Sequence, residues 1–505
     1  MKKSLLQRLP AFGLFLAIAL MFGVAVIGCE TGKPNTDKNE YTVTFTIGNK
    51  KSIVDMLPKG VTAGSVSWES NAPAVASVSK DGIVSALGIT TGGNNTFVSG
   101  PATGIATITA KADGDTVLTV TVNTTTAAQV DLMTLPPLKD TLKDHFPMTG
   151  NILSSPTVEI TGTGAGLTVS NPQLLRHFNA LTAENHMKPS YFVTGRTGTT
   201  FTYNWNSPDR FVNAAYNSGF KVIGHTLLWH SQSGAHIANI PGSLNAADAL
   251  TAMENYITEV VTRYKGKIHT WDVLNEVFPD NVNSGMNWEN VMRKTGDSQA
   301  PNPWYVAIGS DFVYKGFLAA RFADPDAILY YNDYNTEQEG KATMIRNMVR
   351  DVNIRYKAAY PSASHSNNGT RNLIEGIGMQ EHHNLSVTPA SIRKSLQMFK
   401  EIGVKVSVSE LDVLGNANYS AFSSSTGQGG NKHTQSAVTN TQLITQAARF
   451  REYMAVYLEF KDIIERISLW GITDNQSWRS GGLPLLFDHN GRAKPAYYSF
   501  IEALK

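Results

Sequence analysis

Residues 388–412 read TPASIRKSLQMFKEIGVKVSVSELD and contain a complete helix-to-strand unit. Thr388 suits a helix N-cap, and Pro389 suits the first helical position. Apolar residues then recur at helical spacing until Gly403, a residue typical of a helix end. The strand VKVSVSE follows at once and ends in Glu410. A helix that runs directly into a short strand predicts one unit of a parallel α/β sheet.

The same alternation of short apolar strands and longer amphipathic helices extends from about residue 130 to the C-terminus. Eight strand candidates lie near residues 146–150, 178–183, 220–225, 268–275, 328–333, 374–380, 404–410 and 467–473. This number of units predicts a (β/α)8 barrel, a TIM barrel of the α/β class. Seven strands end in, or are followed by, a charged or polar residue: Glu184, His225, Glu276, Asp333, Gln380, Glu410 and Asp474. Because the carboxyl ends of barrel strands converge on one face, we expect catalysis there.

The chain before the barrel has a different pattern. From Tyr41, short β-branched segments alternate with Gly, Asn, Asp and Pro clusters, which predicts a small all-β sandwich over residues 41–123. The segments VSWESNAPAVASVSKDGIVSAL, GIATITA and TVLTVTV resemble the bacterial immunoglobulin-like group 2 (BIG2) domain. A spacer or weak surface-binding role is expected of it. Thr-rich sequence then indicates a linker at 124–130, before a barrel domain at 131–505.

The N-terminus has the pattern of an export signal. Basic residues precede an apolar run over residues 11–28, and the run ends in Val-Ile-Gly-Cys, which resembles the bacterial lipobox. Cys29 is the only cysteine, so no internal disulfide can form. We therefore expect a lipoprotein signal peptide at 1–28, a lipidated Cys29, a flexible tether at 29–40, and an exported lipoprotein at the cell surface or in the periplasm. The alternative is a single-pass anchor, because the run is near the minimum length of a membrane span.

Charge excludes one class of partner. Without the three basic residues of the first 28, the chain has 40 basic and 41 acidic residues, a net charge of −1. No basic stripe with interleaved aromatic residues is present, so we expect no nucleic-acid partner. A neutral polysaccharide is compatible with this balance.

Two carboxylates carry the candidate chemistry. Glu276 ends the fourth strand in WDVLNE, and Glu410 ends the seventh in VSVSELDV. These strands face each other across an eight-stranded barrel, so both side chains can reach one cleft. Cleaving a glycosidic bond with retention needs two carboxyl groups, about 5–5.5 Å apart. Asn275, just before Glu276, is placed to bind a sugar hydroxyl.

The barrel region as a whole resembles glycoside hydrolase family 10, the endo-β-1,4-xylanase family. The matching segments are, in chain order, LTAENHMK, GHTLLWHSQ, WDVLNEVF, YYNDYN, GIGMQEHH, VSVSELDV, LWGITDNQSWR and PLLFDHNGRAKPAYY. The resemblance implies retaining endo-hydrolysis of β-1,4 linkages in xylan and xylo-oligosaccharides through a covalent glycosyl-enzyme. It implies no metal and no organic cofactor, and we expect a monomer.

The resemblance also assigns roles. Glu276 would be the acid/base and Glu410 the nucleophile, with His382 hydrogen-bonded to Glu410 and Asn275 holding the 2-hydroxyl of the sugar under attack. Asp333 would support the network around the acid/base. The remaining substrate-binding positions are Glu184, Asn185, Lys188, His225, Trp229 and Gln232 on the non-reducing side of the cleft, Gln380 in the Gln-x-His motif, and Trp470 and Trp478 as apolar walls.

Several alternatives stay open from sequence alone. The histidines and tryptophans could be ordinary core residues, and His383 could replace His382, because a one-residue slip in a strand turns the side chain to the other face. Pro189 stands where many relatives have Trp, which removes one expected sugar contact. Two rival functions are a carbohydrate-binding protein with an inert barrel and a β-1,4-glucanase. Xylose lacks the hydroxymethyl group of glucose, so crowding by Trp470 and Trp478 would favour xylose.

Overall fold

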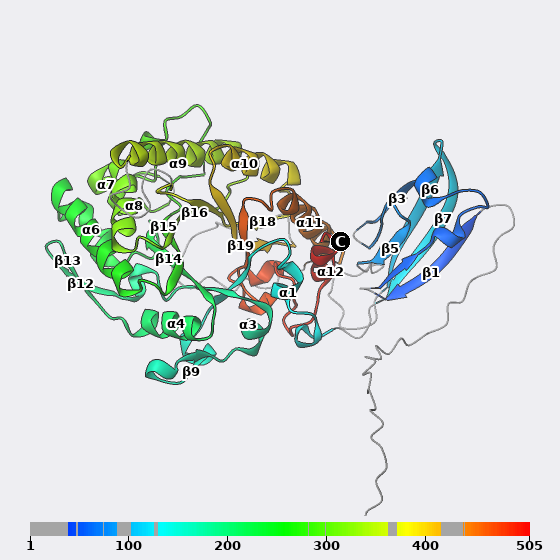
Figure 1. Cartoon of the computed structure of the whole chain (residues 1–505), viewed down its shortest axis with the longest axis horizontal. Helices are drawn as coiled ribbons and strands as arrows, with labels where there is room; N and C mark the ends of the chain where they lie inside the picture. Colours follow the sequence, from blue (N-terminus) through cyan, green and yellow to red (C-terminus); the bar gives the residue numbers. More distant parts are fainter. Residues whose placement is uncertain are drawn as a thin grey trace, which may run out of the picture.

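The computed structural model describes residues 39–504 except 47–48, 74, 88–102, 126–129, 281, 298, 362–370, 416–437 and 439. It contains a small all-β unit followed by a larger α/β barrel, seen on the right and left of Figure 1. The expected signal peptide, Cys29 and most of the tether lie outside the described residues. Within the described part, no helix is long and apolar enough to cross a membrane.

Eight parallel strands close into a barrel. The ring runs β17-β16-β15-β14-β11-β8-β20-β19 and is closed by pairing between β17 and β19. The strands are β8 (Met148–Leu153), β11 (Ala180–Ala183), β14 (Lys221–Leu228), β15 (Ile268–Asn275), β16 (Ile328–Asp333), β17 (Gly376–Met379), β19 (Lys405–Val413) and β20 (Ile464–Leu469). Short β18 (His382–His383) pairs with the end of β19. All eight predicted strands are present, so the predicted barrel is confirmed.

Helices surround the strands (Figure 1). They are α1 (Leu138–Leu142), α2 (Pro156–Glu159), α3 (Pro172–His177), α4 (Asn206–Asn217), α5 (Ala235–Ala238), α6 (Ala246–Arg263), α7 (Pro303–Ile308), α8 (Asp311–Ala323), α9 (Glu339–Ala359), α10 (Pro389–Glu401), α11 (Asn440–Glu459) and α12 (Pro495–Glu502). Two short antiparallel pairs, β9 (Ile160–Thr161) with β10 (Thr168–Val169) and β12 (Val193–Thr197) with β13 (Thr200–Tyr203), lie in the loops.

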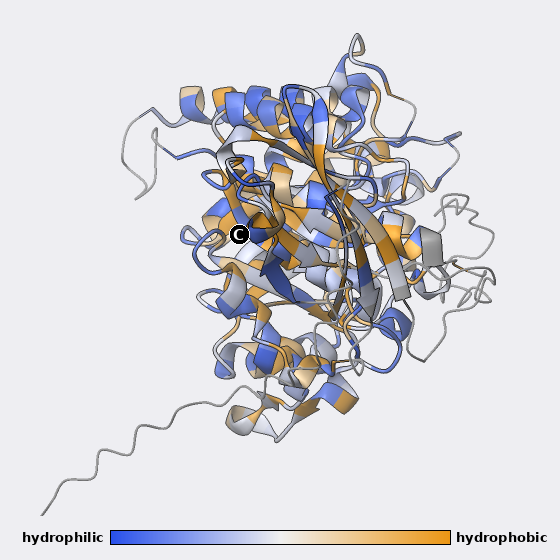
Figure 2. Ribbon diagram, turned by 90° about the vertical axis from the view of Figure 1, so that its right-hand side faces the viewer, coloured by the Kyte–Doolittle hydropathy of each residue, from blue (hydrophilic) through white to orange (hydrophobic). Residues whose placement is uncertain are grey.

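The helix-to-strand unit of residues 388–412 forms as predicted. The Thr388 side chain accepts a hydrogen bond from the Ser391 backbone N–H, and Pro389 is the first residue of α10. Gly403 lies between the end of α10 and the start of β19 and has a φ of 67°, a left-handed conformation that costs glycine little. The apolar face of α10 is buried, and hydrophilic and hydrophobic residues alternate along the helices in Figure 2. Burial of these stripes, rather than helix propensity alone, stabilises the barrel.

The N-terminal unit is a two-sheet sandwich, as predicted. One sheet has the order β1-β7-β6-β3 and the other β2-β5-β4. The strands are β1 (Glu40–Thr46), β2 (Lys50–Ser52), β3 (Ser67–Ser70), β4 (Ala76–Val78), β5 (Ile83–Ala86), β6 (Thr103–Ala112) and β7 (Asp115–Thr125). Both sheets contribute to one apolar cluster that includes Val43, Val84, Ile108 and Val120. Strand β7 continues to Thr125, so it extends two residues into the predicted linker.

The sandwich also contacts the barrel through side chains. Ile444 of α11 joins the apolar cluster of the sandwich, and Ala448 packs against it. Glu502 of α12 accepts a hydrogen bond from Ser85 Oγ at 2.9 Å and pairs with Lys50 Nζ at 3.1 Å. The two units are therefore joined by a docking contact as well as by the covalent connection.

This contact leads to a prediction for a truncated chain that starts at Val130. The barrel has its own large core, so we expect it to fold and to retain most of its activity on soluble substrate. Exposing Ile444 and unpairing Glu502 should cost ~1 kcal/mol, which corresponds to a fall of at most about 4 °C in the thermal midpoint. Calorimetry and circular dichroism would measure this, and loss of cooperative unfolding would show that the sandwich is integral to the barrel.

Candidate active site

The end of β15 places Glu276 in an unusual backbone conformation. Its φ is 52°, in the left-handed region that residues with side chains seldom adopt. The Glu276 N–H donates to the Asn332 carbonyl at 2.9 Å, and Arg293 Nε donates to the Glu276 carbonyl at 2.8 Å. These bonds on both sides hold the strained residue, which is common at functional sites.

Two donors hold the Glu276 carboxylate. Trp229 Nε1 donates to its Oε2 at 2.8 Å, and Gln380 Nε2 donates to its Oε1 at 2.8 Å. His230 Nε2 lies 4.0 Å from Oε2. Burial lowers the pKa of His230 to about 4, so this histidine is neutral at neutral pH.

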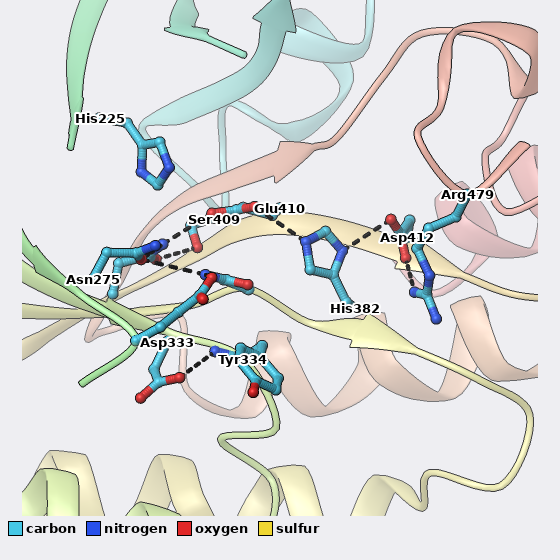
Figure 3. A network of polar contacts seen from close by, with 12 residues as sticks. His225, Asn275, Asp333, Tyr334, His382, Ser409, Glu410, Asp412 and Arg479 are labelled. Atoms are coloured by element: carbon cyan, nitrogen blue, oxygen red, sulfur yellow. Dashed lines mark hydrogen bonds and ion pairs between the residues drawn. The ribbon is translucent and has the colours of Figure 1, made fainter. Parts of the chain in front are cut away.

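The second carboxylate is held by a chain of charged groups. Glu410 Oε2 lies 3.1 Å from His382 Nε2, and His382 Nδ1 lies 2.9 Å from Asp412 Oδ2 (Figure 3). Arg479 donates to the other oxygen of Asp412. Burial alone would lower the pKa of His382, but the carboxylates of Asp412 and Glu410 override it and raise the pKa to about 9. At neutral pH a protonated His382 therefore faces the Glu410 side chain.

Asn275 joins the two carboxylate networks. Its Oδ1 accepts from Asn332 Nδ2 at 3.0 Å and from Gln380 Nε2 at 3.3 Å. Asn332 Nδ2 also donates to Glu410 Oε1 at 2.9 Å, while Gln380 binds Glu276. The Asn275 Nδ2 group is buried and has no hydrogen-bond partner among the described residues. A free donor between two carboxylates is available to a bound ligand.

The surroundings of Glu276 shift the pKa of its carboxyl group. Burial opposes ionisation, yet the pKa lies below its usual range. The positive charge of Arg293 and the hydrogen bonds from Gln380 and Trp229 favour the carboxylate. Both carboxylates are thus held by hydrogen-bond donors.

The predicted residues after β11 and β14 form one polar cluster. Lys188 Nζ donates to Asn185 Oδ1 at 3.1 Å and to Gln232 Oε1 at 2.9 Å, and Gln232 Nε2 donates to Asn185 Oδ1 at 3.1 Å. Lys188 Nζ also lies 5.0 Å from the centre of the Trp229 ring. Burial raises the pKa of Glu184 in the same region, where Lys188 acts against the rise. This cluster adjoins Glu276 through Trp229.

Aromatic groups line the other side of the site. The Trp478 ring centre lies 5.2 Å from that of His382, and the Trp478 side chain is 37% exposed. Trp470 is buried. Its ring centre lies 5.7 Å from that of His225 and 6.3 Å from that of His382. His225 Nδ1 in turn lies 2.9 Å from Asp272 Oδ2. Of the two tryptophans, Trp478 offers the larger open surface to a ligand.

Asp333 contacts groups next to Glu276 and not the Glu276 carboxylate. It accepts from the Tyr331 hydroxyl and lies 2.9 Å from Lys341 Nζ. Burial raises its pKa to about 6. The Tyr331 hydroxyl also accepts from the Val277 N–H at 3.1 Å, so Asp333 is linked to the residue after Glu276.

The sequence of the barrel matches the model of a known protein family. The model of "Glycosyl hydrolase family 10" matches residues 137–503. The chain belongs to glycosyl hydrolase family 10. This match covers nearly all of the barrel and contains every site residue described above.

Family 10 relatives share this region. The chain is 31% identical over 374 residues to endo-1,4-beta-xylanase A of Thermotoga maritima, covering 73% of this chain and 31% of that relative. It is 30% identical over 382 residues to beta-1,4-xylanase of Dictyoglomus thermophilum, covering 73% and 92% respectively. The chain spans between 28% and 32% of the length of the curated relatives it matches first.

A solved structure extends the similarity beyond the barrel. It is a family 10 xylanase containing a bacterial Ig-like domain, from termite gut. It is 49% identical, covers 92% of this chain and 98% of its own, and superposes with a TM-score of 0.72. Because the barrel makes up about three quarters of this chain, the 92% coverage includes part of the N-terminal sandwich.

The structure separates the two adjacent histidines that sequence reasoning left open. His382 contacts Glu410 and Asp412, whereas His383 Nε2 lies 2.8 Å from Glu381 Oε2 and its ring lies 5.0 Å from that of Tyr453. His382, and not His383, is therefore the histidine that contacts Glu410. One strand-end residue lies elsewhere: Asp474 pairs with Lys494 at 3.0 Å. Asp474 supports the loop after β20 instead of the cleft.

Sequence reasoning missed several members of the family 10 site. Asn332 and Asp412 lie inside the segments YYNDYN and VSVSELDV that carry the resemblance. Asp412 follows Glu410 by two residues on β19, a spacing that places both on one face and could have identified it. Three other missed groups also lie inside quoted segments: His230, Arg479 and Ser409, whose Oγ donates to Asn332 Oδ1 at 2.7 Å. Arg293 lies outside all of these segments. Among the described residues, no group of three or more His, Cys, Asp or Glu side chains could hold a metal ion.

The raised pKa of His382 predicts a pH-dependent stability. A histidine whose pKa rises from 6.5 to about 9 on folding stabilises the protein fully below pH 6.5, and this contribution is lost as pH rises through about 9. We expect a loss on the order of 2–3 kcal/mol across this window. His382→Gln should flatten the fall in the thermal midpoint of the barrel between pH 6.5 and 9.5, whereas His236→Gln, at an exposed position on α5, should not. Parallel curves for all three proteins would contradict the charge assignment.

Proposed function

We propose that this chain is a retaining endo-1,4-β-xylanase that cleaves xylan and xylo-oligosaccharides through a covalent glycosyl-enzyme. The observation that carries this proposal is the paired arrangement of Glu276 and Glu410 in a family 10 barrel. Each carboxylate has its own set of donors, and Asn275 lies between the sets. An inert sugar-binding barrel would need neither the second carboxylate nor the charged chain behind it.

In the first step, Glu410 attacks the anomeric carbon while Glu276 donates a proton to the leaving oxygen. The His382–Asp412–Arg479 chain orients Glu410 for attack. Before substrate binds, Glu276 is a carboxylate, because its pKa lies below its usual range. A bound sugar that excludes water from it favours the protonated form, because desolvation penalises the charge.

In the second step, the glycosyl–Glu410 ester is hydrolysed. Glu276 has lost its proton to the leaving group and now takes a proton from water, which attacks the anomeric carbon and releases Glu410. Two inversions at one carbon give overall retention. The free Nδ2 of Asn275 is placed to donate to the sugar 2-hydroxyl during both steps.

Xylan is favoured over glucan by the aromatic wall. Trp470 and Trp478 both contact His382, the partner of the nucleophile, so they lie beside the sugar at the cleavage point. A hydroxymethyl group on that sugar would have to fit against them, whereas xylose has none. Glu184, Asn185, Lys188 and Gln232 supply the hydroxyl-binding cluster on the adjoining side.

A hydrolysis panel tests the proposal. Xylan, cellulose and mixed-linkage glucan would be compared, with products separated and early anomers read by NMR. We expect xylan to be cleaved internally and to yield β-anomers first. Preferential cleavage of cellulose would instead assign a β-1,4-glucanase, and no cleavage of any polymer would favour a binding protein.

We also propose that the N-terminal sandwich is a BIG2-type spacer, that the chain is a monomer, and that Cys29 is the lipidated first residue of an exported lipoprotein. The basic head, the apolar run and the single cysteine support the last of these.

Cys29→Ser should block lipidation and shift the protein from the membrane fraction to the soluble fraction or halt its processing. If the variant still sediments with membranes like the wild type, a membrane-spanning anchor explains the N-terminus better.

A further inference from the structure

One exposed aromatic side chain beside the cleft has no role in the mechanism above. Tyr191 is 43% exposed and ends η5 (Pro189–Tyr191), the short 3-10 helix that follows Lys188. Single exposed aromatic residues are common on protein surfaces, so the neighbours of Tyr191 decide whether its ring has a role. Tyr191 is the one aromatic residue of η5.

Tyr191 adjoins the hydroxyl-binding cluster. The Ser190 N–H donates to the Gln232 carbonyl at 2.8 Å, and the Glu184 carboxylate adds to the rise that burial causes in the pKa of Tyr191. Gln232 accepts from Lys188 Nζ at 2.9 Å, and Lys188 lies over Trp229, which binds Glu276. A chain of contacts therefore runs from Glu276 to the loop that carries Tyr191.

The loop that carries Tyr191 is held rigidly. The Ser190 N–H donates to the Gln232 carbonyl at 2.8 Å, and the Tyr191 N–H donates to the Lys188 carbonyl at 3.0 Å. Gly234 approaches so closely that an added Cβ would lie 3.2 Å from Ser190 Cα. The backbone of Tyr191 is thus fixed before any ligand binds, which reduces the entropy cost of using its ring.

One edge of the ring is supported and the rest is open. The Tyr191 ring packs edge-on against His186, with centroids 5.4 Å apart, and His186 Nδ1 lies 2.6 Å from Ser207 Oγ. An oriented, partly open tyrosine next to hydroxyl-binding side chains is suited to an apolar sugar face.

We propose that Tyr191 is a sugar platform for a xylose unit beyond those bound by Glu184 and Gln232, so that it determines the preference for longer chains. The proposal rests on the function proposed above. Binding energy from this remote unit is used at the cleavage point, so it raises kcat/KM only for substrates long enough to reach the platform.

The test compares substrates of different length. Tyr191→Ala should lower kcat/KM on xylohexaose by about tenfold and leave hydrolysis of 4-nitrophenyl β-xylobioside unchanged. Tyr191→Phe, which keeps the ring, should retain most of the activity on xylohexaose. Tyr216→Ala is the matched control, because Tyr216 is 49% exposed on α4 and contacts no site residue described above. It should match the wild type on both substrates.

The alternatives have distinct outcomes. An equal loss on both substrates would show that Tyr191 is structural, and no loss on xylohexaose would show that it binds no sugar. A loss in Tyr191→Phe as large as in Tyr191→Ala would overturn the role of the ring. If the wild type cleaves xylan but the effect of Tyr191→Ala does not depend on substrate length, only the platform is overturned. A wild type inactive on xylan overturns the proposed function and the platform with it.

Discussion

Glu410→Ala is expected to abolish turnover on every substrate, including activated aryl glycosides. Without the carboxylate no covalent glycosyl-enzyme can form, and His382 and Asn332 lose the group they orient. Loss of a nucleophile that works as part of a unit costs about 10⁵-fold or more in kcat. Initial rates on xylan and on a 2,4-dinitrophenyl xylobioside would measure it.

A matched control separates this loss from misfolding. Glu465→Ala removes another barrel carboxylate, one at the start of β20 that accepts from the Tyr330 hydroxyl at 3.0 Å. It lies at the opposite end of the barrel from the cleft, so it should reduce stability without removing the chemistry. Circular dichroism should show both variants folded. A slow 2-fluoro xyloside provides a direct check, since mass spectrometry should find its label on the wild-type peptide that contains Glu410. A label on any other peptide would contradict the assignment.

The barrel was predictable because its signals are local. A short stretch of sequence is enough to predict each strand and helix. In α10, for example, Thr388 and Pro389 mark the start and Gly403 follows the end. Once eight such units are counted, the geometry of a closed parallel sheet brings strand ends together without any knowledge of distant contacts. Glu276 and Glu410 could therefore be placed in one cleft from sequence alone.

The supporting network was less predictable because its contacts cross between elements. Arg479 lies 67 residues from Asp412 in sequence, and no periodicity links them. His230 was not predicted as a site residue, yet its Nε2 lies 4.0 Å from Glu276 Oε2 and burial makes it neutral. The docking of Ile444 against the sandwich is of the same kind. A sequence pattern shows that a helix face is apolar but does not show what covers it.

Glu276→Ala is expected to behave differently from Glu410→Ala, and the difference identifies the two roles. Another sugar is a poor leaving group, so cleavage of xylan should fall by about 10²–10⁴-fold without the proton donor. A 2,4-dinitrophenolate departs without help, so the first step on the aryl xylobioside should stay fast. The variant should then release one equivalent of phenol in a burst, because the base that activates water is missing from the second step.

Azide completes this prediction, since it needs no base to become a nucleophile. In Glu276→Ala it should enter the space left by the carboxylate, near Trp229 and Gln380, and attack the anomeric carbon of the glycosyl–Glu410 ester. The C–O bond to Glu410 breaks as the C–N bond forms, so the product is the β-glycosyl azide and steady-state turnover recovers. Glu410→Ala has no ester to intercept and should form no β-azide. Equal behaviour of the two variants, or an inverted first product from the wild type, would refute the assignment. Azide should therefore restore turnover in Glu276→Ala and should not restore it through a glycosyl-enzyme in Glu410→Ala.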